Sequence, residues 1–266
     1  MAAFTAKDVQ ALRQATGAGM MDAKKALQDV DGDFEKAKKL LREKGLAKAS
    51  SRSDRANTQG AIALAVAEGA AALVELKCET DFVAKSGDFI NLTQDLADSV
   101  AAKGEAGVGD HKDAVDDLKV TLKENIDVGR VVRLEVGDGQ QLGTYLHRQD
   151  GRGVNGVLVV LEGGYEELAH DVAVHIAFAK PEYLTRDEVP AETVEEERET
   201  LLKVTKAEGK PEQAWPKIVE GRLQGWYKER VLLDQPYVRD EKSSVAQLAS
   251  SNDAQVLRYG QLFIGG

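Results

Sequence analysis

The sequence contains a single cysteine, Cys78, and only 5% of its 266 residues are aromatic. One thiol excludes an intramolecular disulfide and any metal site built from several cysteines. No apolar run approaches the roughly 20 residues that a membrane-spanning helix needs. The N-terminus also lacks a basic region followed by an apolar stretch, as a secretory signal would require. We therefore expect a cytoplasmic protein without a membrane segment, whose cores consist mainly of Ala, Val and Leu.

Residue groups typical of enzymes are scarce as well. Two of the four histidines, His170 and His175, lie five positions apart and so face different sides of a predicted helix, which is not the spacing of a metal-binding pair. No Gly-x-x-x-x-Gly-Lys-Ser/Thr run is present to hold phosphates. The many carboxylates fall on predicted exposed helices, where they are typical of a solvated surface. We expect no catalytic residue, no metal site and no cofactor.

The charge is unevenly distributed along the chain. The net charge is −10, which argues against broad binding of nucleic acid. Residues 1–55 nevertheless carry twelve Lys and Arg against eight Asp and Glu, a net charge of +4, and the remainder carries −14. A basic segment on an acidic body indicates a docking surface, although a solvated linker would give the same count.

Hydrophobic periodicity and turn signals predict an α+β protein. The order hairpin-then-helix occurs twice, at about 60–101 and 143–180, which indicates two related α+β subdomains. A third region holds two charged helices separated by Gly209-Lys210-Pro211, which predicts a projecting antiparallel helical hairpin. The predicted segments are a three-helix module at 1–45, a linker at 46–58, a core N-subdomain at 59–138, the first part of a core C-subdomain at 139–190, the helical hairpin at 191–230, and the closing part of the C-subdomain with the C-terminus at 231–266.

Packing details follow from the same patterns. The third helix of the module is predicted to end at Gly45. In the helical hairpin, the apolar residues expected to face one another are Val194, Leu201, Leu202 and Val204 on the first helix, and Ile218, Val219 and Leu223 on the second.

A short segment at the exit of an apolar strand is the first candidate for function. Leu73 to Cys78 predicts a buried strand, and a helix follows from about Asp88. Thr80 can cap a helical turn between them, beside Asp81 and Phe82. Phe82 has two interpretations, a plug of the core or an aromatic anchor displayed to a pocket on another protein. We call residues 78–84 the corner.

The second candidate is a pair of adjacent methionines, Met20 and Met21. Two neighbouring side chains cannot both face one core, so at least one of them is expected at the surface. A flexible thioether near Arg13 would make an adaptable contact patch. The alternative is one buried Met and one surface Met without a role.

Two runs carry a resemblance to a known family. Leu12–Leu27, with the sequence Leu-Arg-Gln-Ala-Thr-Gly-Ala-Gly-Met-Met-Asp-Ala-Lys-Lys-Ala-Leu, resembles the N-terminal signature of bacterial translation elongation factor Ts. Cys78-Glu-Thr-Asp-Phe-Val-Ala84 resembles the second signature of that family. Further matches, in the order of the family, are Glu124-Asn125-Ile126, His175-Ile176-Ala177 with Lys180-Pro181, and Val219-Glu220-Gly221-Arg222.

The resemblance implies a guanine-nucleotide exchange factor and not an enzyme with turnover chemistry of its own. Its partner would be the GTPase elongation factor Tu, bound as the GDP form and left nucleotide-free until GTP binds, in a 1:1 or 2:2 complex without direct contact to nucleic acid. The implied fold has a module of the ubiquitin-associated type, a core of two related α+β subdomains and a protruding helical hairpin.

The resemblance also implies roles for individual residues. Thr80, Asp81, Phe82 and Val83 would dislocate Mg²⁺ from elongation factor Tu, with Phe82 entering between two helices of the GTPase. Further partner contacts, listed here by their positions in this chain, would be Arg13, Met20, Met21, Ile126 and His147.

The sequence departs from the family in two places. Ala23 stands where many relatives have Cys. The chain also ends at Gly265-Gly266, soon after the last predicted strand, so we expect a C-terminal helical contact of some relatives to be absent.

Two alternatives stay open at this point. The three-helix module could recruit another protein or tRNA while the rest acts as a scaffold, or the chain could be a metabolic enzyme.

Overall fold

The computed structural model describes residues 4–265. Residues 1–3, part of the segment on which the prediction of no secretory signal depends, and Gly266, at the chain end, lie outside the described residues. The chain forms two compact units. Unit 1 consists of Met1–Arg133, Leu146–Asn155 and Leu262–Gly266, and unit 2 of Leu134–Tyr145 and Gly156–Gln261.

Unit 1 begins with the three-helix module, formed by α1 (Ala6–Thr16), α2 (Met20–Asp29) and α3 (Phe34–Ser50). Local signals set the helix ends. Thr5 and Asp8 form a capping box before α1, Gly17 ends that helix in the left-handed conformation, and Asp33 caps α3. The helices bury a small shared core of Val9, Leu12, Ala23, Ala26, Leu27, Ala37 and Leu41.

The predicted end of the third helix is wrong, since α3 continues past Gly45 to Ser50. Leu46 to Ala49 are good helix formers and propagate the helix. Gly45 instead allows close packing with α6 (Lys112–Leu122), because a Cβ atom at this position would lie 2.5 Å from Cγ1 of Val120. The first five residues of the predicted linker at 46–58 are therefore helical.

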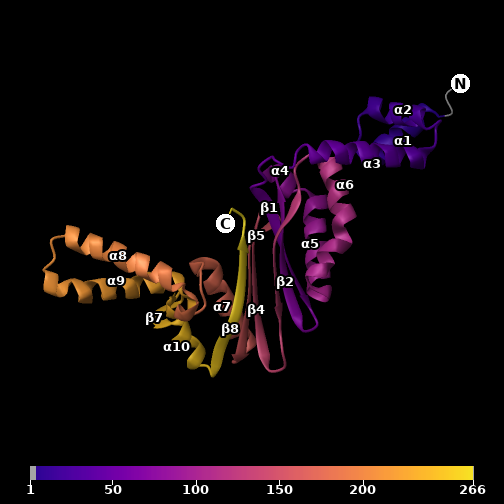
Figure 1. The fold of residues 1–266 in the computed structure, drawn as a ribbon. Helices are drawn as coiled ribbons and strands as arrows, with labels where there is room; N and C mark the ends of the chain where they lie inside the picture. Colours follow the sequence, from indigo (N-terminus) through magenta and orange to yellow (C-terminus); the bar gives the residue numbers. More distant parts are fainter. Residues whose placement is uncertain (1–3, 266) are drawn as a thin grey trace. The chain divides into compact units, whose positions relative to one another are not determined.

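The rest of unit 1 is a sheet covered by helices. β1 (Gln59–Ala67) and β2 (Ala70–Cys78) form an antiparallel hairpin in register from Gln59↔Cys78 to Ala67↔Ala70. β3 (Asp127–Glu135) lies beside β2, and Ile62 of β1 pairs with Gly153 of β5 (Arg152–Gly163). Figure 1 shows α5 (Gly87–Lys103) running along this hairpin. A short α4 (Asp81–Ala84) precedes α5, and a 3-10 helix at Glu105–His111 follows it.

Unit 2 repeats the combination of strands and a covering helix. β5 pairs with β4 (Gln140–Gln149) and with β8 (Ala254–Phe263), and α7 (Glu166–Ala179) packs Leu168, Val172 and Ile176 against Val157, Val159 and Leu161 of β5. At Gly143 of β4 a Cβ atom would collide with the carbonyl oxygen of Ala169, so only glycine allows α7 to come this close.

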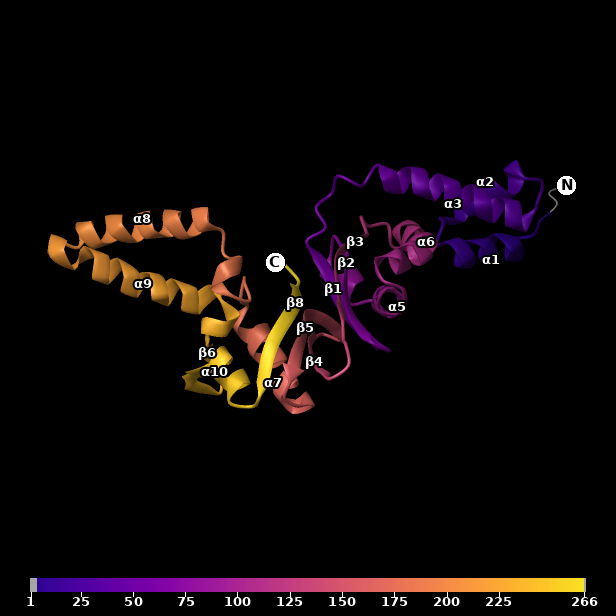
Figure 2. The same cartoon turned by 60° about the horizontal axis from the view of Figure 1, so that its bottom comes forward.

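Unit 2 also carries the helical hairpin, formed by α8 (Ala191–Ala207) and α9 (Trp215–Arg230) (Figure 2). Ion pairs cross it between Arg198 and Glu220 at 3.1 Å and between Arg222 and Glu208 at 2.7 Å. The seam differs from the prediction at one turn, because Val204 is 44% exposed and Thr205 is fully buried in its place. The Thr205 hydroxyl donates to the carbonyl of Leu201 and accepts from Arg222, which satisfies it inside the seam.

Short elements complete unit 2. They are 3-10 helices at Arg186–Glu188, Glu212–Ala214 and Leu232–Asp234, strands β6 (Pro236–Tyr237) and β7 (Asp240–Ser244), and α10 (Val245–Ser250). The predicted α+β class is confirmed. Over residues 4–265, every helix is too short or too polar to cross a membrane.

Candidate partner-binding site

The corner forms because a buried strand gives way to one turn of helix. β2 is buried almost throughout, and it ends at Cys78, which is fully buried. Burial raises the pKa of the Cys78 thiol to about 12, so the thiol stays protonated, and it donates to the carbonyl of Thr80 at 3.2 Å. Cys78 is therefore a core residue, and its buried side chain anchors the first residue of the corner.

Thr80 starts the helical turn. Its backbone is extended, and its hydroxyl oxygen accepts a hydrogen bond from the amide of Val83 at 3.3 Å. The four residues of α4 then follow, and successive side chains on a helix point about 100° apart. Ala84 is fully buried and Val83 packs on the core of unit 1, so Phe82 must point the opposite way from Ala84.

Phe82 is accordingly 83% exposed, the highest value among the large hydrophobic side chains described. The plug interpretation is therefore wrong for this side chain. The neighbouring Phe89 fills the core below and is fully buried. An exposed aromatic ring on a rigid turn presents a large apolar contact area with little rotational freedom to lose, which favours an anchor for another protein.

Asp81 lies on the same turn and is held by a lysine. Lys85 contacts Asp81 at 2.8 Å and Asp150 at 3.0 Å. The hydrogen bond from Lys85 lowers the pKa of the Asp81 carboxyl, so this group is ionised at neutral pH. Lys85 thus ties α4 to the turn that follows β4, and it leaves the Asp81 carboxylate 44% exposed beside Phe82.

The methionine pair lies in the first turn of α2. Met20 is 48% exposed and Met21 is 73% exposed, because α2 turns Ala23, Ala26 and Leu27 to the core of the module. Both methionines are therefore displayed, in agreement with the expectation of at least one at the surface. Arg13 is also exposed, on the neighbouring α1.

The remaining two residues predicted to contact the partner, His147 and Ile126, differ in exposure. His147 is exposed near the end of β4. Ile126 is fully buried in the core of unit 1, packed with residues of α5 and β2. Its side chain is not available to a partner in this structure, and we leave Ile126 out of the contact surface proposed below.

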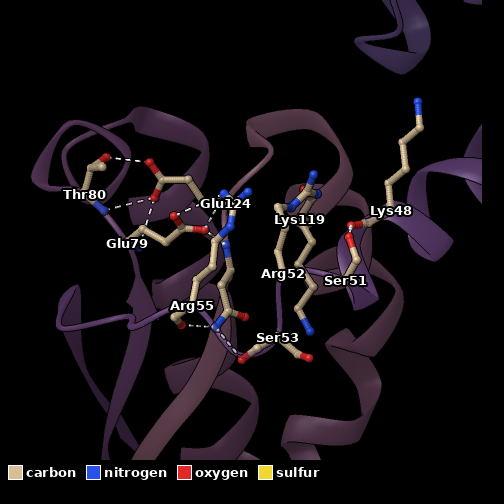
Figure 3. Close-up of polar contacts among 10 residues, drawn as sticks. Lys48, Ser51, Arg52, Ser53, Arg55, Glu79, Thr80, Lys119 and Glu124 are labelled. Atoms are coloured by element: carbon tan, nitrogen blue, oxygen red, sulfur yellow. Dashed lines mark hydrogen bonds and ion pairs between the residues drawn. The ribbon is translucent and has the colours of Figure 1, made fainter.

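The structure also shows features that the sequence did not predict. Phe178, near the end of α7 in unit 2, is 75% exposed although it lies on a helix whose other apolar residues are buried or half-buried. Glu79 and Glu124 form a polar cluster behind the corner, shown in Figure 3. The two glutamates are 45 residues apart in sequence, so no local pattern could have paired them.

Residues 4–265 contain no group of three or more His, Cys, Asp or Glu arranged to hold a metal ion. A cavity of about 670 Å³ lies between the module and α6 and is lined mainly by small apolar and lysine side chains. None of the residues predicted for the site lines it. Residues predicted for the site instead form exposed contact surfaces. One is the helical turn that carries Phe82, and the other is the pair Met20 and Met21 on the three-helix module.

Known proteins identify the class of this chain. The family model described as "Elongation factor TS" matches residues 79–266, which begin in the corner. Proteins named "Elongation factor Ts" match the chain over its whole length. The protein of Renibacterium salmoninarum is 44% identical, and those of Micrococcus luteus and Clavibacter michiganensis are 43% identical, with both chains fully covered in each case.

The chain belongs to the elongation factor Ts family. It is thus an elongation factor of protein biosynthesis, and the family as a whole serves nucleotide exchange on elongation factor Tu.

Proposed function

We propose that this chain is a guanine-nucleotide exchange factor that binds the GDP form of elongation factor Tu and accelerates the release of GDP. The single observation that carries the proposal is Phe82, 83% exposed on a capped turn within the Thr80–Val83 signature. A protein that works by contact needs a rigid, displayed anchor, and this ring meets that description.

In this proposal, GDP release depends on a change at the magnesium site of the partner. Phe82 enters between two helices of the GTPase and shifts the loops that hold Mg²⁺, with Thr80, Asp81 and Val83 shaping the turn that carries the ring. Mg²⁺ neutralises phosphate charge, so displacement of its ligands weakens the binding of the nucleotide. Coupling between two ligands is reciprocal, so the factor binds the nucleotide-free GTPase more tightly than the GDP form. The nucleotide-free complex then persists until GTP binds.

The exposed surface of the module supplies the second contact. Met20, Met21 and Arg13 dock on the GTPase, and His147 adds a contact from β4. The complex is 1:1 or 2:2, which light scattering of the purified complex distinguishes. The net charge of −10 supports binding without direct contact to nucleic acid. The proposed partner places the protein in the cytoplasm, where translation takes place.

The proposal is tested by release of a fluorescent GDP analogue from elongation factor Tu, followed by stopped flow with excess unlabelled GDP. The full chain is expected to accelerate release strongly in the presence of Mg²⁺. After Mg²⁺ has been chelated the additional acceleration should be much smaller, because the displacement has already occurred. No acceleration would refute the exchange function, and equal acceleration with and without Mg²⁺ would refute the magnesium route alone.

A substitution in the module separates docking from exchange. Met21→Ala is expected to raise the half-saturating concentration of the factor roughly fivefold, the usual effect of truncating a contributing contact residue. The maximal release rate should stay near that of the unaltered chain, because the corner is intact. Val66→Ala is the matched control, since Val66 is an exposed apolar residue of unit 1 outside the proposed surface. A loss of maximal rate with unchanged half-saturation would contradict a docking role.

A further inference from the structure

Three separate segments of unit 1, one of them part of the corner itself, meet in a network of hydrogen bonds. They are residues 53–55 after α3, residues 79–80 at the end of β2, and residues 124–125 between α6 and β3. Figure 3 shows Glu79, Thr80 and Glu124 gathered there, with Arg55 alongside. We call this set of contacts the brace.

Glu124 is the centre of the brace on the corner side. Its Oε2 accepts hydrogen bonds from the amides of Glu79 at 3.0 Å and Thr80 at 3.1 Å, and its Oε1 accepts from the Thr80 hydroxyl at 2.6 Å. Three donors thus converge on one carboxylate, and hydrogen bonds to an ionised acceptor are stronger than neutral ones. Lys123, which ends α6 in the left-handed conformation with φ 59°, turns the chain so that Glu124 follows directly.

A second set of contacts runs in the opposite direction. Glu79 Oε1 accepts a hydrogen bond from the amide of Asn125 at 2.7 Å. The Asn125 side-chain amide, buried at 6% exposure, donates to the carbonyls of Ser53 at 3.1 Å and Arg55 at 2.7 Å. The brace therefore fixes the corner both to the segment before β3 and to the segment that leaves the module.

Thr80 transmits this restraint to Phe82. The Thr80 hydroxyl donates to Glu124 and at the same time accepts from the amide of Val83, so its rotamer is set from both sides. One isolated turn of helix is unstable in water, so α4 depends on its cap and on tertiary contacts. Phe82 itself is 83% exposed and has little packing of its own to orient it.

We propose, on the basis of the function proposed above, that Glu124 is a positioning residue for nucleotide exchange. Through its hydrogen bonds to Thr80, Glu124 holds the corner in the conformation that exposes Phe82. The ring therefore enters the partner without the corner first having to become ordered. Lys85, bonded to Asp81 and Asp150, still anchors the far side of α4 when Glu124 is replaced, so the turn gains freedom only on the Thr80 side. Loss of Glu124 therefore loosens the corner without unfolding unit 1.

Two substitutions at this position distinguish the brace from a general effect of charge. Glu124→Ala removes all three acceptor contacts, and we expect the maximal rate of GDP release at saturating factor to fall roughly tenfold. Glu124→Gln keeps an oxygen for the backbone amides and an amide that can donate to the Thr80 hydroxyl. We expect this variant to stay within about threefold of the unaltered chain. Glu68→Ala, which removes an exposed carboxylate from the turn between β1 and β2, is the control and should change nothing.

A measurement on the free protein tests the positioning directly. In Glu124→Ala, amide hydrogen exchange of a peptide covering residues 79–86 should be roughly tenfold faster, while peptides from β1 and α5 keep their exchange rates. Faster exchange across all of unit 1 would mean a global loss of stability and would overturn the proposal. Unchanged exchange at the corner would overturn it equally.

The kinetic assay separates this inference from the function on which it rests. If the unaltered chain does not accelerate release, the exchange function fails and the positioning role fails with it. If the unaltered chain accelerates release and Glu124→Ala does so to the same extent, only the positioning role is refuted. A tenfold loss in Glu124→Ala, with recovery in Glu124→Gln and faster exchange confined to the corner, supports it.

Discussion

Replacement of Phe82 by alanine should remove most of the exchange activity while the fold stays intact. The ring is 83% exposed, so truncation costs the free protein little, and the free energy of unfolding should change by less than about 0.5 kcal/mol. A central aromatic anchor typically contributes about 2 kcal/mol or more to an interface, which corresponds to a loss of roughly 30-fold in accelerated GDP release. Stopped-flow release of a fluorescent GDP analogue from elongation factor Tu measures this directly.

The chain offers a matched control in Phe178, which is 75% exposed and lies near the end of α7 in unit 2. Phe178→Ala removes the same side chain from a surface outside the corner, and it should leave the release rate within about twofold. If both variants lose activity to the same extent, exposed apolar area in general drives binding and the corner has no special role. If Phe82→Ala retains the full rate, the anchor lies elsewhere.

Sequence patterns predicted the structure most reliably for elements whose formation depends on residues close together in the chain. The hairpin of β1 and β2 was predicted within residues 60–101, and its register is the one that a two-residue turn at Glu68 and Gly69 sets. The helical turn of the corner likewise follows from Thr80 as a cap. The exposure of Phe82 did not follow from local pattern, because a Phe after a strand serves equally well as core, and only the family resemblance favoured display.

Errors arose where distant segments decide the outcome. Gly45 predicted the end of α3, but this glycine instead allows α6 to pack closely on α3, a contact between residues 75 positions apart in sequence. Ile126 was expected to contact the partner because of a matching motif, yet its side chain is fully buried in the core of unit 1. In the same motif, Glu124 and Asn125 form the brace, so the three residues are placed by packing and hydrogen bonding behind the corner.

A second large effect is expected at an ion pair in the sheet of unit 1 between a buried glutamate and an arginine whose side chain is 41% exposed. Glu75 of β2 is 5% exposed, and its carboxylate accepts hydrogen bonds from Arg130 of β3, from Nε at 3.0 Å, from Nη2 at 3.1 Å and from the backbone amide at 3.2 Å. Arg130 also donates to the carbonyl of Phe263 at 2.6 Å. Arg130→Met would leave a buried carboxylate with one hydrogen bond, which should lower the free energy of unfolding by about 3 kcal/mol.

The loss should depend on pH with a definite sign. Burial alone raises the pKa of the Glu75 carboxyl, but the hydrogen bonds and charge of Arg130 outweigh it and hold the pKa below its usual value. In the unaltered chain this group therefore stabilises the fold above its unfolded pKa, and the contribution is lost as pH falls through the lower folded pKa. In Arg130→Met only the backbone amide of residue 130 and the charge of Lys77 still oppose the effect of burial, so the pKa of Glu75 rises, and protonation on acidification relieves the penalty.

The difference in unfolding free energy between the unaltered chain and Arg130→Met should therefore be largest near neutral pH and shrink as the pH approaches about 4, the usual range of glutamate. Urea unfolding at several pH values, followed by circular dichroism, measures it. Arg148→Met is the control, since Arg148 is exposed on β4, and it should stay within about 0.5 kcal/mol of the unaltered chain at every pH. A difference that does not vary with pH would mean that Glu75 is not left ionised and buried, and that Arg130 stabilises the sheet through packing and its bond to Phe263 alone.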